Sequence, residues 1–242
     1  MRNIIMTRNK GMGKLSFVPF ILGLFVLALS GCNQESPSKK AIQYQENYEI
    51  VGSEKDELLG NVSDAIFKTS DRSNKGAEEL FIEDVSKGEI SVPSGRYRIA
   101  GEMTGNVYIH DENGNLLYHA IVGSPYGVES ITVDLDETDT ITMDGFDQAY
   151  VMPAKTQLST ELTAGIWEVG TDIEAGDYAI SSPYGLGYLQ IFDQNEDPVV
   201  FEVIGGGFEG TESDIQLRNG QKLRITDISM IHFENGDSPP AL

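Results

Sequence analysis

Thr171-Asp-Ile-Glu-Ala-Gly-Asp-Tyr-Ala-Ile180, in the C-terminal part of the chain, matches Ile90-Ser-Val-Pro-Ser-Gly-Arg-Tyr-Arg-Ile99 at an offset of 81 residues. A glycine, a tyrosine and an isoleucine occupy the same places in both stretches. After one inserted residue the offset becomes 82, and matching residues continue almost to the end of the chain. A constant offset over such a span predicts a duplicated unit of about 80 residues.

Each unit is predicted to be built of β-strands. Short runs of aliphatic and aromatic residues alternate with turn residues, which is typical of a β-sandwich or barrel. Asn113-Gly114 predicts a hairpin turn between strands 107–110 and 116–122. In the second unit we expect strands at 166–169, 177–181, 187–192, 199–204, 213–217, 222–226 and 229–233.

The fold class that follows is mainly β, with two tandem units at residues 85–154 and 162–236 and a short tail at 237–242. A mixed segment, 42–84, precedes them. In its residues 42–53 apolar and polar residues alternate loosely, a pattern that is ambiguous but compatible with a strand. Its residues 54–72 are predicted to form an amphipathic helix, because five apolar residues fall on one helical face: Leu58, Leu59, Val62, Ile66 and Phe67.

The first 31 residues have the layout of a secretory signal peptide, with a basic stretch, an apolar run from Leu15 to Leu29 and then small residues. The run has 15 residues, or about 22 Å as a helix, which is short of the roughly 30 Å of bilayer hydrocarbon. Leu29-Ser30-Gly31-Cys32 resembles the lipobox of bacterial lipoproteins. The resemblance implies cleavage before Cys32 and a diacylglycerol on its sulfur. The two acyl chains of that group would anchor the protein stably in a membrane.

Residues 32–41 are polar and are expected to form a flexible tether behind this anchor. The expected location is therefore the extracytoplasmic face of a bacterial cell membrane. The opening of the second unit, Val169-Gly-Thr-Asp-Ile-Glu-Ala-Gly-Asp-Tyr178, resembles a β-module of secreted and lipid-anchored proteins of Gram-positive bacteria. The first unit departs from this pattern, with Glu89 and Val92 at the Gly170 and Ile173 positions. The resemblance implies a fold and a location, and it carries no catalytic residue.

Composition excludes some functions. Residues 1–31 hold four of the 17 basic residues and none of the 38 acidic ones, so the remainder has 13 basic and 38 acidic residues and a net charge of −25. Nucleic-acid binding is not expected, because it requires basic residues to neutralise phosphates. Cys32 is the only cysteine, so no internal disulfide is available.

No catalytic set is visible in the sequence. The chain has no G-x-S-x-G motif and only three histidines. His110 and His119 are predicted to lie on one face of the Asn113-Gly114 hairpin, as ordinary strand histidines or, alternatively, as a metal pair. We therefore expect a protein that is not an enzyme.

Two acidic turns begin as an EF-hand loop does, with Asp111 and Asn113 in the first unit and Asp193 and Asn195 in the second. Both lack the Gly at position 6 and the Glu at position 12 that such a loop requires. Calcium at these turns is an alternative to plain turn chemistry, for which Asp and Asn are also standard residues. No other cofactor is expected.

Ser-Pro-Tyr-Gly occurs at residues 124–127 and again at 182–185, and both copies are expected to form turns. The functional alternative is that Tyr126 and Tyr184, together with Phe208, present rings on loops for a sugar or a protein partner. We expect Trp167 to be packed in a strand.

Together these features predict a lipid-anchored envelope protein that serves as a non-enzymatic binding or structural module. The alternatives are a small-ligand or glycan binder that uses the three loop rings and, less favoured, a hydrolytic enzyme. The expected partners are the membrane, through Cys32, and an envelope protein or glycan.

Overall fold

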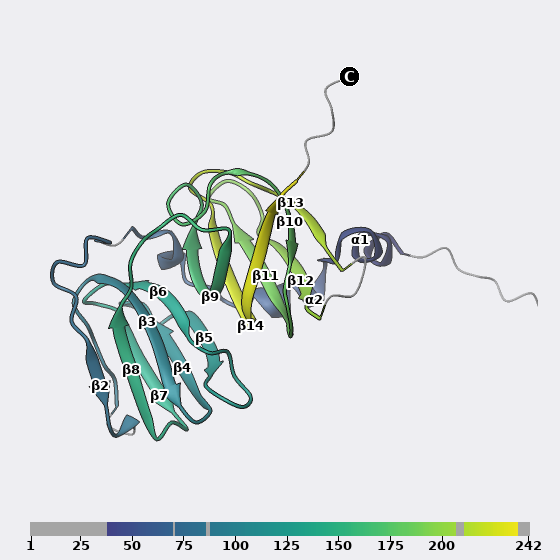
Figure 1. Ribbon diagram of the computed structural model, residues 1–242. Coiled ribbons are helices and arrows are strands. Elements are labelled where there is room, and N and C mark those ends of the chain that lie inside the picture. The colour runs from purple at the N-terminus through teal and green to yellow at the C-terminus, as the bar shows by residue number, and fades with distance from the viewer. Residues whose placement is uncertain (1–37, 70, 86–87, 207–210, 237–242) are drawn as a thin grey trace, which may run out of the picture. The chain divides into compact units, whose positions relative to one another are not determined.

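The structure is mainly β, as the sequence predicts. The computed structural model describes residues 38–69, 71–85, 88–206 and 211–236. Within these ranges the strands form an eleven-stranded sheet and a three-stranded sheet (Figure 1). None of the helices in this part of the chain is long and apolar enough to cross a membrane. The signal sequence, Cys32, Phe208 and the C-terminal tail lie outside the described residues.

Residues 38–69, here called the N-terminal segment, contain short elements. Ser38 caps the first helix by accepting a hydrogen bond from the backbone N–H of Ala41 at 3.2 Å. Gly60 ends the second helix with a φ of 58°. The elements are α1 (Lys39–Asn47), β1 (Glu49–Ile50), α2 (Ser53–Leu59) and the 3₁₀ helix η1 (Asp64–Phe67).

The structure differs in extent from the predictions for this segment. The helix expected over residues 54–72 ends at Leu59, because the chain turns at Gly60 and continues in extended and 3₁₀ conformation. The apolar residues that predicted the helix are buried without forming one. Ile66 is buried, and Val62 packs beside it against the core of the following β region. Residues 39–41, expected in a tether, belong to α1. The possible strand at 42–53 is confirmed only at Glu49–Ile50 (β1), because residues 42–47 continue α1.

Residues 80–153, here called the first β region, form two layers. Strand β3 pairs with β6 and β8, and β8 pairs with β2, while β4 lies between β5 and β7 in the three-stranded sheet. Burial alternates along β4, as expected for a strand with one face on a core. The strands are β2 (Leu80–Ile82), β3 (Gly95–Glu102), β4 (Gly105–His110), β5 (Leu116–Val122), β6 (Ile131–Leu135), β7 (Thr140–Asp144) and β8 (Gln148–Pro153).

The Asn113-Gly114 hairpin forms between β4 and β5 as predicted. Tyr108 pairs with His119 in the expected register, and their rings stack at 4.4 Å. The register then shifts, so that His110 pairs with Leu116 rather than with Leu117. This irregularity turns both Leu117 and Tyr118 inward.

Residues 161–235, here called the second β region, have their own buried core. Strand β10 pairs with β13 and with the end of β14, and β11 pairs with β12 and with the start of β14. The two strands predicted at 222–226 and 229–233 are one long strand, with an irregularity between Ile225 and Met230. The strands are β9 (Glu161–Glu168), β10 (Gly176–Ser181), β11 (Leu186–Phe192), β12 (Val199–Ile204), β13 (Ser213–Leu217) and β14 (Lys222–Asn235).

One backbone contact joins the sheets of the two β regions. Thr132 of β6 pairs in parallel with Gly165 of β9. Gly165 has a φ of 141°, and a Cβ on it would lie 2.0 Å from the carbonyl oxygen of Thr132, so only glycine fits. Beside this contact Tyr118 of β5 donates a hydrogen bond from its hydroxyl to the carbonyl of Ile225 at 2.5 Å. The two β regions are therefore joined by both backbone and side-chain contacts.

Candidate functional site

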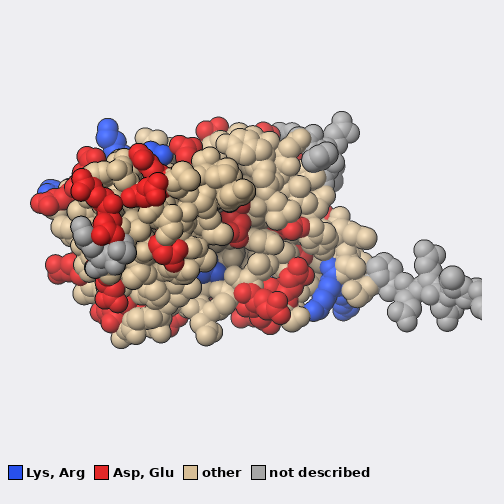
Figure 2. Space-filling view, turned by 90° about the horizontal axis from the view of Figure 1, so that it is seen from below, with Lys and Arg blue, Asp and Glu red and all other residues tan. Residues whose placement is uncertain are grey.

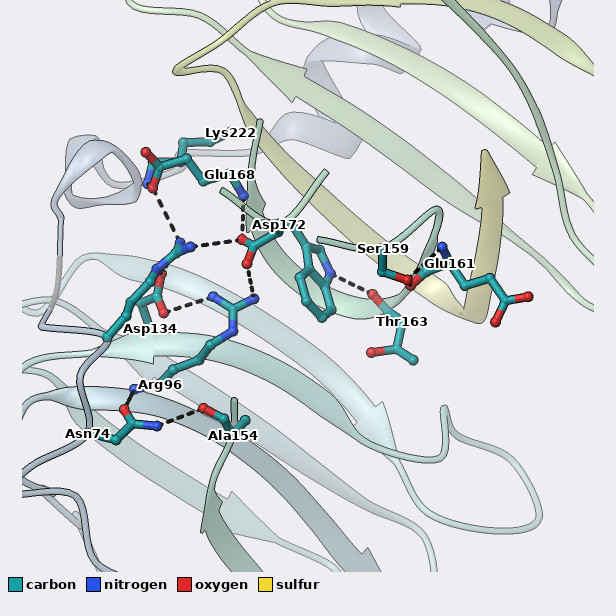
Figure 3. A network of polar contacts seen from close by, with 12 residues as sticks. Asn74, Arg96, Asp134, Ala154, Ser159, Glu161, Thr163, Glu168, Asp172 and Lys222 are labelled. Carbon is teal, nitrogen blue, oxygen red and sulfur yellow. Dashed lines mark hydrogen bonds and ion pairs between the residues drawn. The ribbon is translucent and has the colours of Figure 1, made fainter. Parts of the chain in front are cut away.

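A network of charged side chains lies where the two β regions meet (Figure 3). Three basic groups alternate with three carboxylates, so their charges balance. The first three members come from the first β region and the connection before it, and the last three come from the second β region. They are Arg72, Arg96 and Asp134, then Glu168, Asp172 and Lys222.

Asp172 receives both guanidinium groups. Its Oδ2 lies 3.0 Å from Nη1 of Arg72, and its Oδ1 lies 3.3 Å from Nη2 of Arg96. The turn after β9 fixes its position, because the backbone N–H of Glu168 donates to Oδ2 at 2.8 Å and the backbone N–H of Asp172 donates back to the Glu168 carbonyl at 2.8 Å. The carboxylate is thus held by its own turn as well as by the two arginines.

The other carboxylates complete the network. Asp134 accepts from Nη1 of Arg96 at 2.9 Å and from Nε of Arg72 at 2.9 Å. Glu168 lies 3.3 Å from Arg72 and accepts from Nζ of Lys222 at 2.8 Å. Arg72, in the connection before the first β region, therefore contacts one carboxylate of that region and two of the second.

Arg96 is fully buried, which is rare for an arginine. Its guanidinium lies 4.6 Å from the centre of the Trp167 ring, and the ring is fixed by a hydrogen bond from Nε1 to the carbonyl of Thr163 at 2.7 Å. Trp167 is thus packed in a strand, as predicted, and it also covers a buried charge. Nε and Nη2 of Arg96 have no hydrogen-bond partner among the described residues. The charge is compensated by the hydrogen bond to Asp134, the ion pair with Asp172 and this ring.

Burial and charge act in opposite directions in this network. Burial raises the pKa of Asp172, and the guanidinium groups of Arg96 and Arg72 oppose that rise. Burial lowers the pKa of Arg72, but the carboxylates beside it, Asp134 first, outweigh burial and raise it overall. Every charged group contacts an opposite charge, so the arrangement is suited to holding the two β regions together.

A second buried arginine attaches the N-terminal segment. Arg224 of β14 donates to Oε1 of Gln190 at 2.5 Å and to the carbonyl of Leu59 at 2.9 Å, and its guanidinium lies over the ring of Phe192. Burial lowers its pKa to about 10. Because Leu59 ends α2, the cation lies at the negative end of that short helix.

The predicted loop aromatics lie in separate places. Tyr126 is 85% exposed in the loop between β5 and β6, and Tyr184 is 61% exposed in the loop between β10 and β11. The structure therefore presents two of the three rings to solvent, on different β regions. Phe208 and Cys32 lie outside the described residues.

The carboxylate oxygens of the first acidic turn are already hydrogen-bonded. Asp111 accepts from the Ser63 hydroxyl at 2.5 Å, from the backbone N–H groups of Asn113 and Asn115 at 2.8 and 2.9 Å, and from the Asn115 side chain at 3.1 Å. The bond from Ser63, followed by those from Asn115 and Asn113, holds the pKa of Asp111 well below its usual range. Asp111 thus fixes the hairpin turn and ties it to the N-terminal segment.

The second acidic turn is built in the same way. Asp193 accepts from the backbone N–H of Asn195 at 2.9 Å and from Gln221 at 3.2 Å, and it lies 3.3 Å from Arg218. Among the described residues no group of three or more His, Cys, Asp or Glu side chains is placed to hold a metal. Calcium binding at these turns stays a prediction.

Sequence reasoning missed the charge network. Asp172 falls inside the repeated motif, but nothing in the sequence marks it as buried, and its partner Arg72 lies 100 residues away. No protein-family model matches the chain, and no curated protein matches it either.

Proposed function

We propose that this protein is a non-enzymatic binding or structural module of the bacterial cell envelope, held at the membrane by lipid on Cys32. The observation that carries the proposal is the charge network between the β regions. Its ionisable groups neutralise one another, so they serve to fix two β regions in one arrangement. A fixed framework with exposed rings on its loops is suited to presenting a surface to a partner.

The anchor is tested at the N-terminus of the mature protein. Mass spectrometry of the protein purified from its own membrane should find Cys32 as the first residue, carrying a diacylglycerol. The Cys32→Ser variant should leave the membrane fraction, whereas a control substitution of Ser30 by Ala should not. An unmodified Cys32 in the native protein would contradict the proposed anchor.

The two β regions are further proposed to be copies of one ancestral unit. Strand registers support this at the offset found in the sequence. Gly95 pairs with Leu135 as Gly176 pairs with Leu217, and Ile99 pairs with Val151 as Ile180 pairs with Phe233.

The tyrosine of the repeated motif adds a side-chain match. Tyr97 donates from its hydroxyl to the carbonyl of Pro93, and Tyr178 donates to that of Glu174, four residues upstream in each case. Both hydroxyls therefore close the same turn, which accounts for the tyrosine in both copies. The resemblance to the Gram-positive β-module fits this proposal.

The second candidate function is binding of a small ligand or glycan through Tyr126, Tyr184 and Phe208. The exposure of Tyr126 and Tyr184 favours it, because exposed rings stack on sugar faces. Co-sedimentation with insoluble peptidoglycan tests this alternative. Binding that the Tyr126→Ala/Tyr184→Ala variant loses would favour a glycan over a protein partner.

Photo-crosslinking in living cells tests the binding role itself. A photoreactive amino acid at position 126 or 184 should give a discrete adduct with an envelope component. Position 158 is the matched control, because Leu158 is also an exposed apolar residue but lies outside these loops. Identical adducts from all three positions would refute a role for the loops, and cleavage of an envelope polymer by the purified protein would favour an enzyme.

A further inference from the structure

Strand β2 is the last strand of the large sheet. It pairs with β8 through Leu80↔Val151, Phe81↔Tyr150 and Ile82↔Ala149, and it ends the strand order on that side. The N–H and C=O groups of its outer edge are therefore not paired with any strand among the described residues. An uncovered edge of this kind accepts a further strand.

Three other edges are covered by the chain itself, although β1, which covers one of them, ends the strand order on its own side. Strand β1 lies along β12, with Glu49 opposite Phe201. The side chain of Asn47 covers the edge of β13, because its Oδ1 accepts from the backbone N–H of Asp214 at 2.6 Å and its Nδ2 donates to the Asp214 carbonyl at 2.8 Å. The backbone N–H of Ser63 donates to the Leu116 carbonyl at the edge of β5 at 3.2 Å. Unlike the edges of β12, β13 and β5, the outer edge of β2 has no such cover among the described residues, and β2 is longer than the other terminal strand, β1.

An apolar hollow accompanies the open edge. Its volume is about 410 Å³, and β2 and the connection after it form its walls. Phe81 is 45% exposed, and its ring rests against Tyr150 at 5.1 Å. The apolar lining consists of Leu80, Phe81, Ile82, Val85 and Ile90, with Glu83 and Asp84 beside them.

The surroundings of β2 are strongly acidic. Residues 78–89 contain five carboxylates, all exposed, and a single basic residue. Figure 2 shows many acidic side chains on the side of the molecule where the first β region lies in Figure 1, and a further acidic group toward the other side. A second copy of this chain would bring like charges together across a β2–β2 edge, which is unfavourable. The charge selects a basic occupant.

We infer that the edge of β2 binds an extended segment of a partner protein in which basic and apolar residues alternate, and that the segment adds to the sheet as a further strand. Side chains of a strand alternate between faces. Apolar side chains of the partner would lie on the core side beside Leu80 and Ile82. Basic ones would lie on the outer side beside Phe81 and the carboxylates of Glu79 and Glu83. Hydrogen bonds between the two backbones would supply affinity, and the side-chain contacts on the two faces of the sheet would supply specificity.

This inference goes beyond the proposed function, because it assigns a different surface from the loops that carry Tyr126 and Tyr184. The two can therefore fail separately. A protein that keeps its loop adducts but does not bind the peptide described next would refute the β2 inference alone. One that binds the peptide but gives no loop adducts would refute the loop proposal alone.

The probe is a fluorescent peptide of alternating lysine and valine, titrated with the full-length protein and followed by anisotropy. Glu79→Lys/Glu83→Lys should weaken binding by about tenfold or more, as expected when attractive charge pairs become repulsive. The matched control is Glu137→Lys/Glu234→Lys, which makes the same charge change at two exposed acids elsewhere. It should change affinity by less than about twofold, because remote surface charges are screened by salt.

A second peptide tests strand addition. N-methylation of alternate residues removes backbone donors and leaves every side chain in place, so the N-methylated peptide should not bind. The unmodified peptide should bind and should protect the amides of β2 from hydrogen exchange. Equal binding of both peptides, or equal effects of the two double variants, would overturn the inference. A dimer that Phe81→Lys converts to a monomer would overturn it too, since a second copy would then cover the edge.

Discussion

The guanidinium of Arg96 in β3 and the indole of Trp167 in β9 face each other at 4.6 Å across the junction of the two β regions. Arg96 is also held by Asp134 from its own β region and by Asp172 from the other. One buried cation therefore contacts both β regions. Two of its neighbours are carboxylates and one is an aromatic ring. Because the cation is buried, removing one of these partners leaves its charge incompletely compensated.

Loss of the carboxylate at the centre of the network should destabilise the protein strongly. We expect Asp172→Asn to lower the free energy of unfolding by roughly 3 kcal/mol, because two buried guanidinium groups lose a counter-charge. Urea denaturation measures the change. Glu129→Gln is the control, since it removes an exposed ion pair, in which the Glu129 side chain is 83% and the Arg98 side chain 44% exposed. This control should lower the free energy of unfolding by less than about 1 kcal/mol. Equal effects would show that the network does not hold the two β regions together.

Gly165 should tolerate no side chain. In Gly165→Ala the new Cβ would meet the carbonyl oxygen of Thr132 at 2.0 Å, so β6 and β9 must separate. The expected loss is about 3 kcal/mol or more, from steric overlap added to backbone strain. Gly220→Ala isolates the strain, because Gly220 has a φ of 87° with no atom within 4 Å of the added Cβ, and it should cost about 1 kcal/mol. Thermal unfolding distinguishes the two variants, and similar melting temperatures would refute the contact.

Asp111 should make stability depend on acid pH. Hydrogen bonds lower its pKa in the folded protein, so its stabilisation is complete above the ordinary aspartate pKa and is lost as the pH falls toward the lower folded value. Asp111→Asn should cost about 2 kcal/mol at neutral pH, where bonds to the charged carboxylate are made. The difference from the native protein should shrink between about pH 5 and pH 2. Urea titrations across this range measure it, and a constant difference would exclude the expected role of the charge.

Asn47 should protect the edge of β13. Asn47→Ala removes both hydrogen bonds to Asp214, so we expect a loss of about 1 kcal/mol and faster amide hydrogen exchange at Asp214. Gln43→Ala on the same helix is the control, since the side chain of Gln43 makes a long, exposed hydrogen bond to Glu49 at 3.4 Å. Unchanged exchange at Asp214 in the Asn47 variant would indicate that another group covers this edge.

Local sequence patterns predicted the strands well and the N-terminal segment poorly. Strands β12 and β13 begin and end at the predicted residues, because β12 is an apolar run and β13 alternates between buried and exposed residues, with turn residues around them. In β14 the turn-like residue Asp227 suggested two strands, yet it adopts a φ of 62° within one bent strand. The elements between residues 39 and 67 take their form from contacts with distant strands, which no local spacing encodes.

The candidate site was less predictable for the same reason. The exposure of Tyr126 and Tyr184 follows from turn-forming residues around them, so sequence could place them on loops. The pair of Arg72 and Asp172 joins residues 100 positions apart, and each looks like an ordinary surface residue in its local sequence. Only the meeting of the two β regions makes them neighbours.

The N-terminal segment also sets an order of events in folding. Glu49 pairs with Phe201, and Asn47 bonds to Asp214, a residue 167 positions later. The β2–β8, β3–β8, β3–β6, β4–β5 and β4–β7 pairs all form within residues 80–153. A chain that emerges from its N-terminus therefore exposes α1 and β1 first and completes their packing last. Such distant pairing is slow, so the helix and strand that emerge first are the last to find their native partners.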